Sequence, residues 1–159
     1  MISLQFSQCR GLSDAFIEYR ESSWVTHVDS ILPPGDPNGG QLLGARLEGG
    51  VAIRPPFYAP FSLILRVDLP CAEAVAAAYY AGLRGELGKP YDKAAILGFA
   101  LDRDWRDAGE WICSELSTAK LEACGYFAFP LSAPANRITP ADELLLVSSR
   151  VPLGAPHPP

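Results

Sequence analysis

One cysteine of this chain stands where its thiol could act as a nucleophile. Cys113 lies in a segment, residues 110–116, that opens an apolar-periodic stretch running to Gly125. The apolar residues recur at helical spacing, which predicts a helix with one apolar stripe, made of Ile112, Leu116, Ala119 and Ala123. Gly125 stands where a left-handed residue would end such a helix. A thiol near the helix start would lie at the positive end of the helix dipole, which favours thiolate.

The start of this helix can be placed in two ways. Asp107 and Glu110 have the spacing of a capping box, which would begin the helix early and leave Cys113 in the second turn. Gly109 instead favours a start near Trp111, which puts Cys113 in the first turn. Only the later start gives the thiol most of the dipole effect, so its predicted acidity depends on this choice.

A cysteine nucleophile needs a base, and the chain has two histidines. His157 lies between prolines near the end of the sequence, so His27 is the candidate base. It belongs to a predicted strand, residues 24–32, whose alternation places His27 and Asp29 on the same face. Residue types alone favour plainer roles, because a lone cysteine beside an apolar stripe is more often a buried small hydrophobe and a lone strand histidine is more often structural.

The elements that must position these residues form strands in the first half and helices in the second. We expect an α+β fold, with an antiparallel sheet or small barrel packed against helices. The predicted strands are near residues 2–6 and at 24–32, 41–47, 51–54 and 61–67. The predicted helices are 14–21, 70–83 (capped by Asp68), 93–101 and the cysteine helix, followed by a helix or strand at 141–148. Residues 1–150 are expected to form one domain, and the Pro-rich tail 151–159 to be disordered.

Composition excludes several classes of function. The net charge is −5, and the 13 basic residues form no run, so nucleic acid and anionic membranes would be attracted poorly. No apolar stretch approaches the ~20 residues of a membrane span, and the first residues lack the layout of a signal peptide, so a cytoplasmic location is expected. The spacing of the four cysteines, Cys9, Cys71, Cys113 and Cys124, predicts reduced thiols.

Neither a metal nor a cofactor is expected. One usable histidine and scattered cysteines do not have the spacing of a typical zinc site. The sequence also has no phosphate-binding loop and no dinucleotide-binding fingerprint. The chemistry predicted for this chain therefore rests on its own side chains.

Four short motifs follow one another along the chain, and their order is informative. They are Thr26-His27-Val28-Asp29, Gly49-Gly50-Val51, Gly88-Lys89-Pro90-Tyr91-Asp92 and Trp111-Ile112-Cys113-Ser114-Glu115-Leu116. The set, which spans about residues 24–126, resembles the circularly permuted papain-like hydrolases of the NlpC superfamily, and within it the YiiX-like branch. In that family the histidine strand precedes the cysteine helix.

The resemblance implies roles for individual residues. Cys113 would be the nucleophile, His27 the base, and Tyr91 a residue whose hydroxyl lies near the nucleophile and helps to hold the oxyanion. The orienting residue departs from the family pattern. Relatives often have a glycine two residues after the histidine and a Glu or His on the next strand, whereas this chain has Asp29 at the first position and glycine and alanine near the second. Asp29 is favoured as the orienting residue, and Glu48 is the alternative.

The implied activity is acyl transfer through a Cys113 thiolate, as in a cysteine peptidase or amidase acting on a soluble peptide, including a cell-wall peptide, or on another acyl substrate. Two alternatives remain open. One is a lipid or thioester acyltransferase that uses the same pair of residues, and the other is a non-catalytic binding module that keeps the fold. The sequence does not predict the substrate or the oligomeric state.

Overall fold

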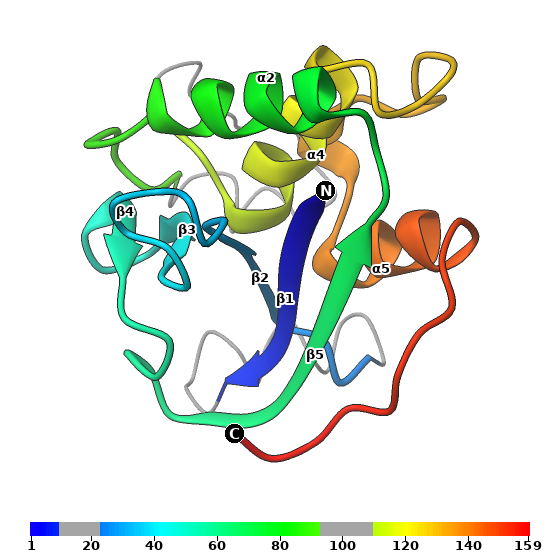
Figure 1. The fold of residues 1–159 in the computed structure, drawn as a ribbon. Coiled ribbons are helices and arrows are strands. Elements are labelled where there is room, and N and C mark those ends of the chain that lie inside the picture. Colours follow the sequence, from blue (N-terminus) through cyan, green and yellow to red (C-terminus); the bar gives the residue numbers. More distant parts are fainter. Residues whose placement is uncertain (10–22, 93–109) are drawn as a thin grey trace.

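The computed structural model describes residues 1–9, 23–92 and 110–159. Within them, five strands form one antiparallel sheet in the order β4-β3-β2-β1-β5 (Figure 1). The strands are β1 (Ile2–Cys9), β2 (His27–Ile31), β3 (Leu42–Arg46), β4 (Gly50–Arg54) and β5 (Phe61–Leu69). The helices are α2 (Glu73–Arg84), α4 (Cys113–Ala123), the short 3₁₀ helix η1 (Ala135–Arg137) and α5 (Pro140–Ser148). The predicted α+β class is confirmed, and the described sheet is open, with β4 and β5 at its edges. The predicted helices 14–21 and 93–101 lie outside the described residues.

The first strand, β1, is an inner strand of the sheet, because β2 pairs with one of its edges and β5 with the other. Ile2, Leu4 and Phe6 are fully buried, and the alternate residues from Ser3 to Ser7 are buried as well. The alternation of apolar and polar residues in this segment would suggest a strand buried on one face, but both faces of β1 are buried. The polar side of β1 is accommodated by hydrogen bonds, such as that from the Ser3 amide to the Tyr80 hydroxyl at 3.0 Å.

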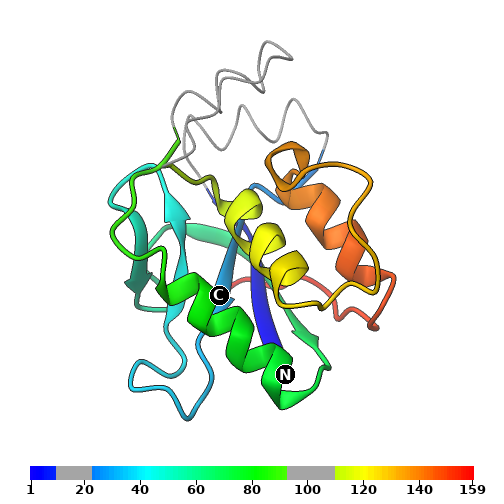
Figure 2. The same cartoon turned by 90° about the horizontal axis from the view of Figure 1, so that it is seen from above.

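Helix α4 is the central helix. It packs against β2 and β3 and lies between α2 and α5 (Figure 2). Its Leu116 belongs to one continuous core that joins the sheet to the helices, together with Phe6, Val28, Leu43, Leu83 and Val147. This arrangement brings the first turn of α4 against the strand that carries His27.

The limits of α4 decide between the two predicted starts. The helix begins at Cys113 after an extended Ile112, and Glu110 and Trp111 are not helical, so the early start is wrong and the thiol lies in the first turn. The predicted end is confirmed. Gly125 has φ of +74°, its amide donates to the Glu122 carbonyl, and the Tyr126 amide donates to the Leu121 carbonyl, both at 3.0 Å. These two bonds form a Schellman motif.

The predicted apolar stripe on α4 is only partly correct. Ile112 and Leu116 are buried, but Ala119 is half-buried and Ala123 is exposed. Every residue from Cys113 to Thr118 is buried, polar ones included. The reason is that the first turns of this helix lie among the sheet, α2 and α5, so burial there follows the neighbours on all sides rather than one face.

The structure also bears on three predictions outside α4, which concern the start of α2, residues 140–148 and the Pro-rich tail. Asp68 does not cap α2, because β5 continues to Leu69 and Ala72 is the N-cap; the Asp68 carboxylate instead accepts from the Ser3 hydroxyl at 2.6 Å. Residues 140–148 form a helix, α5, with a capping box between Thr139 and Asp142. In the Pro-rich tail, the backbone of His157 pairs with Ile64 at the edge of β5, at 2.8 and 3.0 Å.

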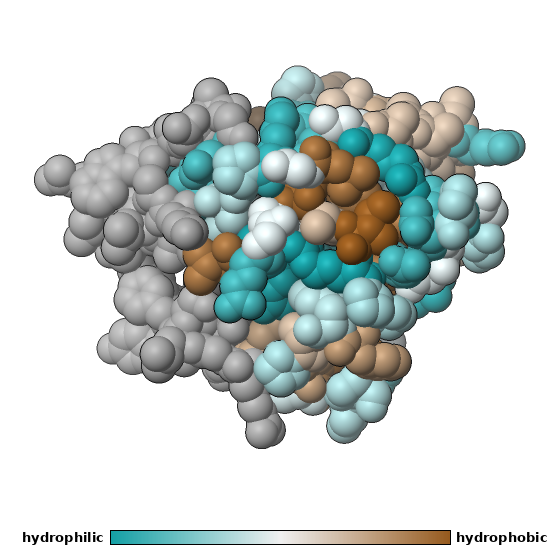
Figure 3. All heavy atoms as spheres, turned by 90° about the vertical axis from the view of Figure 1, so that its left-hand side faces the viewer, coloured by the Kyte–Doolittle hydropathy of each residue, from teal (hydrophilic) through white to brown (hydrophobic). Residues whose placement is uncertain are grey.

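On the face that carries the edge strand β4, apolar residues gather in a small group surrounded by hydrophilic ones (Figure 3).

In the part of the chain that the structure describes, no helix has both the length and the apolar character needed to cross a membrane.

Candidate active site

The structure brings Cys113 and His27 together. His27 is the first residue of β2, Cys113 is the first residue of α4, and the two side chains are close enough to hydrogen-bond. Both are almost completely buried, with exposed fractions of 4% for His27 and 5% for Cys113. Electrostatic interactions are strong in such a place because little water screens them.

Each member of this pair shifts the pKa of the other. Burial by itself would lower the pKa of His27, but Asp29 and Cys113 outweigh burial and raise the pKa to about 10. Burial by itself would raise the pKa of Cys113, yet the neighbouring imidazole and a hydrogen bond from the Val28 backbone lower it. Position in the first turn of α4 acts in the same direction. Both shifts favour the pair in which a thiolate lies beside an imidazolium over the neutral pair.

The structure places Asp29, and not Glu48, beside the histidine. The Asp29 Oδ2 atom lies 3.0 Å from His27 Nε2, and the carboxylate is 2% exposed. Glu48 is exposed in the turn between β3 and β4. Burial would raise the pKa of Asp29, but His27, the Tyr58 hydroxyl and Arg46 together lower it, so this acid is ionised. Because Nε2 faces Asp29, the other ring nitrogen, Nδ1, is left for the thiol.

The carboxylate occupies space that a glycine leaves free on the neighbouring strand. A Cβ atom on Gly44 would lie 2.0 Å from Asp29 Oδ1, a distance that real Cβ contacts do not reach. Gly44 stands opposite Asp29 when the pairing of β2 with β3 is continued by one residue. Gly44 therefore leaves free the space that the Asp29 carboxylate occupies.

Sequence reasoning missed Tyr58. This residue lies in the loop between β4 and β5, and its hydroxyl is 2.8 Å from Asp29 Oδ2 and 3.2 Å from His27 Nε2. Arg46 on β3 donates to the same hydroxyl at 3.2 Å. The available signal was a tyrosine among three prolines, Pro55, Pro56 and Pro60, because fixed φ angles stiffen a loop that presents a side chain.

The remaining motifs are joined through the backbone. The Val51 amide donates to the Lys89 carbonyl at 2.9 Å, and a Cβ atom on Gly50 would lie 2.1 Å from that carbonyl oxygen. The next residues pair with the segment before the cysteine, because Trp111 donates to Pro90 and Asp92 donates to Trp111, both at 3.2 Å. Tyr91 thus forms a backbone bridge with Trp111, two residues before Cys113. Its predicted role at an oxyanion stays a prediction.

Charged residues hold Trp111 in place. Its indole nitrogen donates to Glu86 Oε2 at 2.8 Å, and the same carboxylate pairs with Lys120 at 2.7 Å and with Lys89. Both lysine ammonium groups lie over the indole ring, 5.1 and 5.9 Å from its centre. We call these four residues, Trp111, Glu86, Lys89 and Lys120, the Trp111 clamp. It holds the chain in place just before Cys113.

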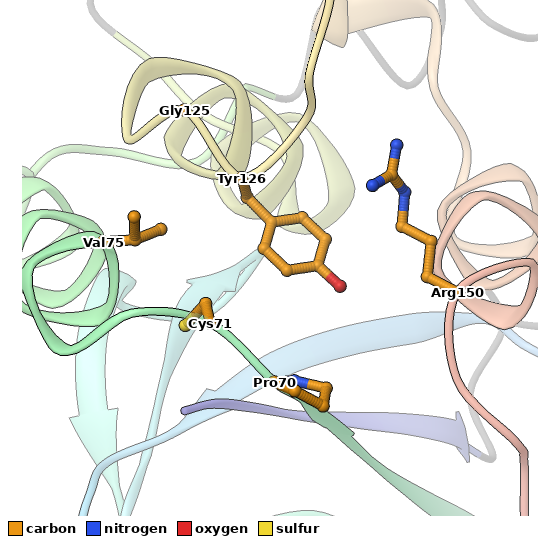
Figure 4. Close-up of a pocket in the computed structure, with 6 residues that line it drawn as sticks. All are labelled: Pro70, Cys71, Val75, Gly125, Tyr126 and Arg150. Atoms are coloured by element: carbon orange, nitrogen blue, oxygen red, sulfur yellow. The ribbon is translucent and has the colours of Figure 1, made fainter.

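A hollow of about 320 Å³ lies elsewhere, lined by Pro70, Cys71, Val75, Gly125, Tyr126 and Arg150 (Figure 4). Gly125 and Tyr126 follow the end of α4, whereas Cys113 begins it, and a helix of 11 residues is roughly 16 Å long. The hollow therefore belongs to the opposite end of this helix from the thiol.

The described residues contain no group of three or more potential metal ligands. Neither the protein-family models nor the curated proteins include a match to this chain.

Proposed function

We propose that this protein is a cysteine-dependent amide hydrolase, a peptidase or amidase. The observation that carries the proposal is the buried series Cys113, His27 and Asp29, in which a thiol at a helix N-terminus contacts an imidazole whose far nitrogen faces a carboxylate at 3.0 Å. The order and backbone linkage of the four motifs, which resemble the permuted papain-like hydrolases, support the same class.

The reaction begins with attack of the Cys113 thiolate on the amide carbonyl carbon, which forms a C–S bond and an oxyanion. The Cys113 amide at the start of α4 is a donor available to this oxyanion, and Tyr91 is the second donor that the resemblance implies. Collapse of the intermediate breaks the C–N bond, and His27 Nδ1 gives its proton to the leaving amine. His27 then takes a proton from water, which attacks the thioester and releases a carboxylic acid and the thiolate.

Asp29 keeps the imidazole oriented and stabilises its charged form through both halves of this cycle. The alternative of a non-catalytic module drew on the unusual position of the orienting residue. The contact between Asp29 and His27 favours the catalytic alternative, because it supplies that residue from β2 itself.

The test is the reactivity of the four thiols, which requires no knowledge of the substrate. At about pH 6 a free thiol is almost wholly protonated, whereas a thiolate held by an imidazolium is not. Iodoacetamide should therefore label Cys113 before Cys9, Cys71 and Cys124 in the native protein, as read by peptide mass mapping. Replacement of the base, His27→Ala, should move this labelling toward higher pH, with an unchanged circular dichroism spectrum as the control for folding.

Equal labelling of all four cysteines, or labelling of Cys113 only after denaturation, would reject the proposal. In that case Cys113 would be a buried structural thiol. A protein that passes the labelling test can then be offered amide and thioester substrates, whose relative turnover separates hydrolysis of amides from acyl transfer.

A further inference from the structure

We propose that Tyr58 and Arg46 are positioning residues that hold Asp29 and fix which nitrogen of His27 carries the proton. This inference rests on the proposed function, because it concerns the same site. It is carried by contacts that converge from three parts of the fold, namely β2, β3 and the loop between β4 and β5.

The direction of each hydrogen bond follows from the chemistry of the groups. A guanidinium has only donors, so the contact of Arg46 Nη1 with Tyr58 uses a lone pair of the hydroxyl oxygen. The single hydroxyl proton is then directed to the carboxylate, at 2.8 Å from Oδ2. Since this proton is already used, the contact of His27 Nε2 with the hydroxyl at 3.2 Å requires an N–H on Nε2. Nδ1 is therefore the nitrogen that exchanges a proton with the thiol.

Asp29 depends on these contacts because it has few others. Its Oδ1 atom faces Gly44 and has no hydrogen-bond partner among the described residues. The carboxylate is consequently oriented through Oδ2 alone, by His27 on one side and Tyr58 on the other. Without the Tyr58 hydroxyl, His27 would be the one remaining partner of Oδ2. Asp29 would then be oriented by the same histidine that it is meant to orient.

Tyr58 is itself held firmly. The guanidinium groups of Arg46 and Arg54 lie 5.2 and 5.4 Å from the centre of its ring, and Phe61 packs against the ring edge-on at 5.3 Å. Burial, followed by the charge of Asp29, raises the pKa of Tyr58, so its hydroxyl keeps its proton at every working pH. Arg46 in turn also donates to Cys9 Sγ at 3.4 Å.

The first experiment measures the rate at which iodoacetamide alkylates Cys113, as a function of pH, in two tyrosine variants. Tyr58→Phe keeps the ring but removes a donor to a charged group, so alkylation at pH 6 should slow by roughly tenfold. The rise of the alkylation rate with pH should also move to higher pH. Tyr80→Phe is the matched control, because it likewise removes a hydrogen-bonded hydroxyl, one that accepts from the Ser3 amide at 3.0 Å and donates to the Ile31 carbonyl at 2.9 Å. Its profile should coincide with that of the unmodified protein.

Arg46→Gln should move the profile in the same direction as Tyr58→Phe. The double variant should lose less than the product of the two single effects, because both residues act on one carboxylate. The titratable and charged groups around Cys113 and the Tyr58 hydroxyl are His27 and Asp29 on β2, Arg46 on β3 with its contact Cys9, Arg54 over the tyrosine ring, and Glu143, whose pKa is raised by burial and by the charge of Cys113.

The second experiment observes the proton directly. The chain has two histidines, so a protein labelled with ¹⁵N-histidine gives signals from His27 and from the exposed His157, which serves as the reference. In Cys113→Ala protein, at a pH above the titration of His27, the neutral ring should carry its proton on Nε2. A proton on Nδ1 would overturn the inference.

The outcomes are separable from those of the proposed function. If Cys113 of the unmodified protein is not the most reactive thiol, the hydrolase proposal fails, and the NMR measurement still tests the arrangement of protons. If Cys113 is reactive but Tyr58→Phe gives the profile of the unmodified protein, or Tyr80→Phe slows the reaction equally, only the positioning role fails.

Discussion

Gly44→Ala is the substitution whose effect on the candidate site follows most directly from geometry. The added Cβ atom would lie 2.0 Å from Asp29 Oδ1 and 3.1 Å from Asp29 Cγ, whereas real Cβ contacts essentially never fall below 3.0 Å. The carboxylate must therefore move by about 1 Å or more, since it is the side chain in contact. That movement is enough to break the 3.0 Å contact between Oδ2 and His27 Nε2.

The cost can be estimated from the bonds that are lost. A hydrogen bond to a charged group contributes roughly 1.5–3 kcal/mol, and the acid is buried, so Gly44→Ala should lower the free energy of unfolding by about 2–4 kcal/mol. The imidazolium would lose its partner, and alkylation of Cys113 at pH 6 should slow by at least tenfold. Urea denaturation measures the first quantity, and timed iodoacetamide labelling measures the second.

Two comparisons make this prediction specific. Gly35→Ala is the matched control, because a Cβ atom added at Gly35 would have no heavy atom within 4 Å and Gly35 has no positive φ, so neither quantity should change. In an Asp29→Ala background the clash is gone, and the further cost of Gly44→Ala should nearly disappear. An equal cost in both backgrounds would refute the steric explanation.

Two other variants test the orienting acid and the Trp111 clamp. Asp29→Asn should slow Cys113 labelling at pH 6 more than Glu48→Gln, because only Asp29 contacts His27; the reverse order would move the orienting role to Glu48. Burial would raise the pKa of Glu86, but its bonds to Lys120, Lys89 and Trp111 lower the pKa to about 2, below the unfolded value of 4.5. The stability that this carboxylate contributes is therefore complete above about pH 4.5 and is lost as the pH falls toward 2. Glu86→Gln should cost roughly 1–2 kcal/mol at pH 7 in urea denaturation and should remove the share of the acid dependence in this range that Glu86 contributes. If Glu86→Gln leaves the fall of the unfolding free energy at acid pH unchanged, the Trp111 clamp contributes nothing measurable to stability.

Several features were determined by the sequence itself, because they depend on local periodicity. The alternation of side chains along a strand places His27 and Asp29 on one face whatever the rest of the chain does. Gly125 ends its helix because a left-handed residue is needed there, and glycine adopts that conformation without strain. With two histidines in the chain, one of them between prolines near the end of the sequence, the choice of His27 as candidate base also required no structure.

Other features depend on neighbours that are distant in sequence. The start of α4 at Cys113 has no side-chain cap, and the extended chain before it pairs instead with residues 90–92, a contact that no local pattern contains. The choice of Asp29 over Glu48 depends on the space beside Gly44, and the contribution of Tyr58 depends on a loop folding back across β3 to meet Arg46. Ala123 is exposed although its spacing predicts burial, because only the first turns of the helix, Cys113–Thr118, are buried on every side. Tertiary packing decided these points because hydrogen bonds and steric contacts between separate elements do not leave a periodic signal along the chain.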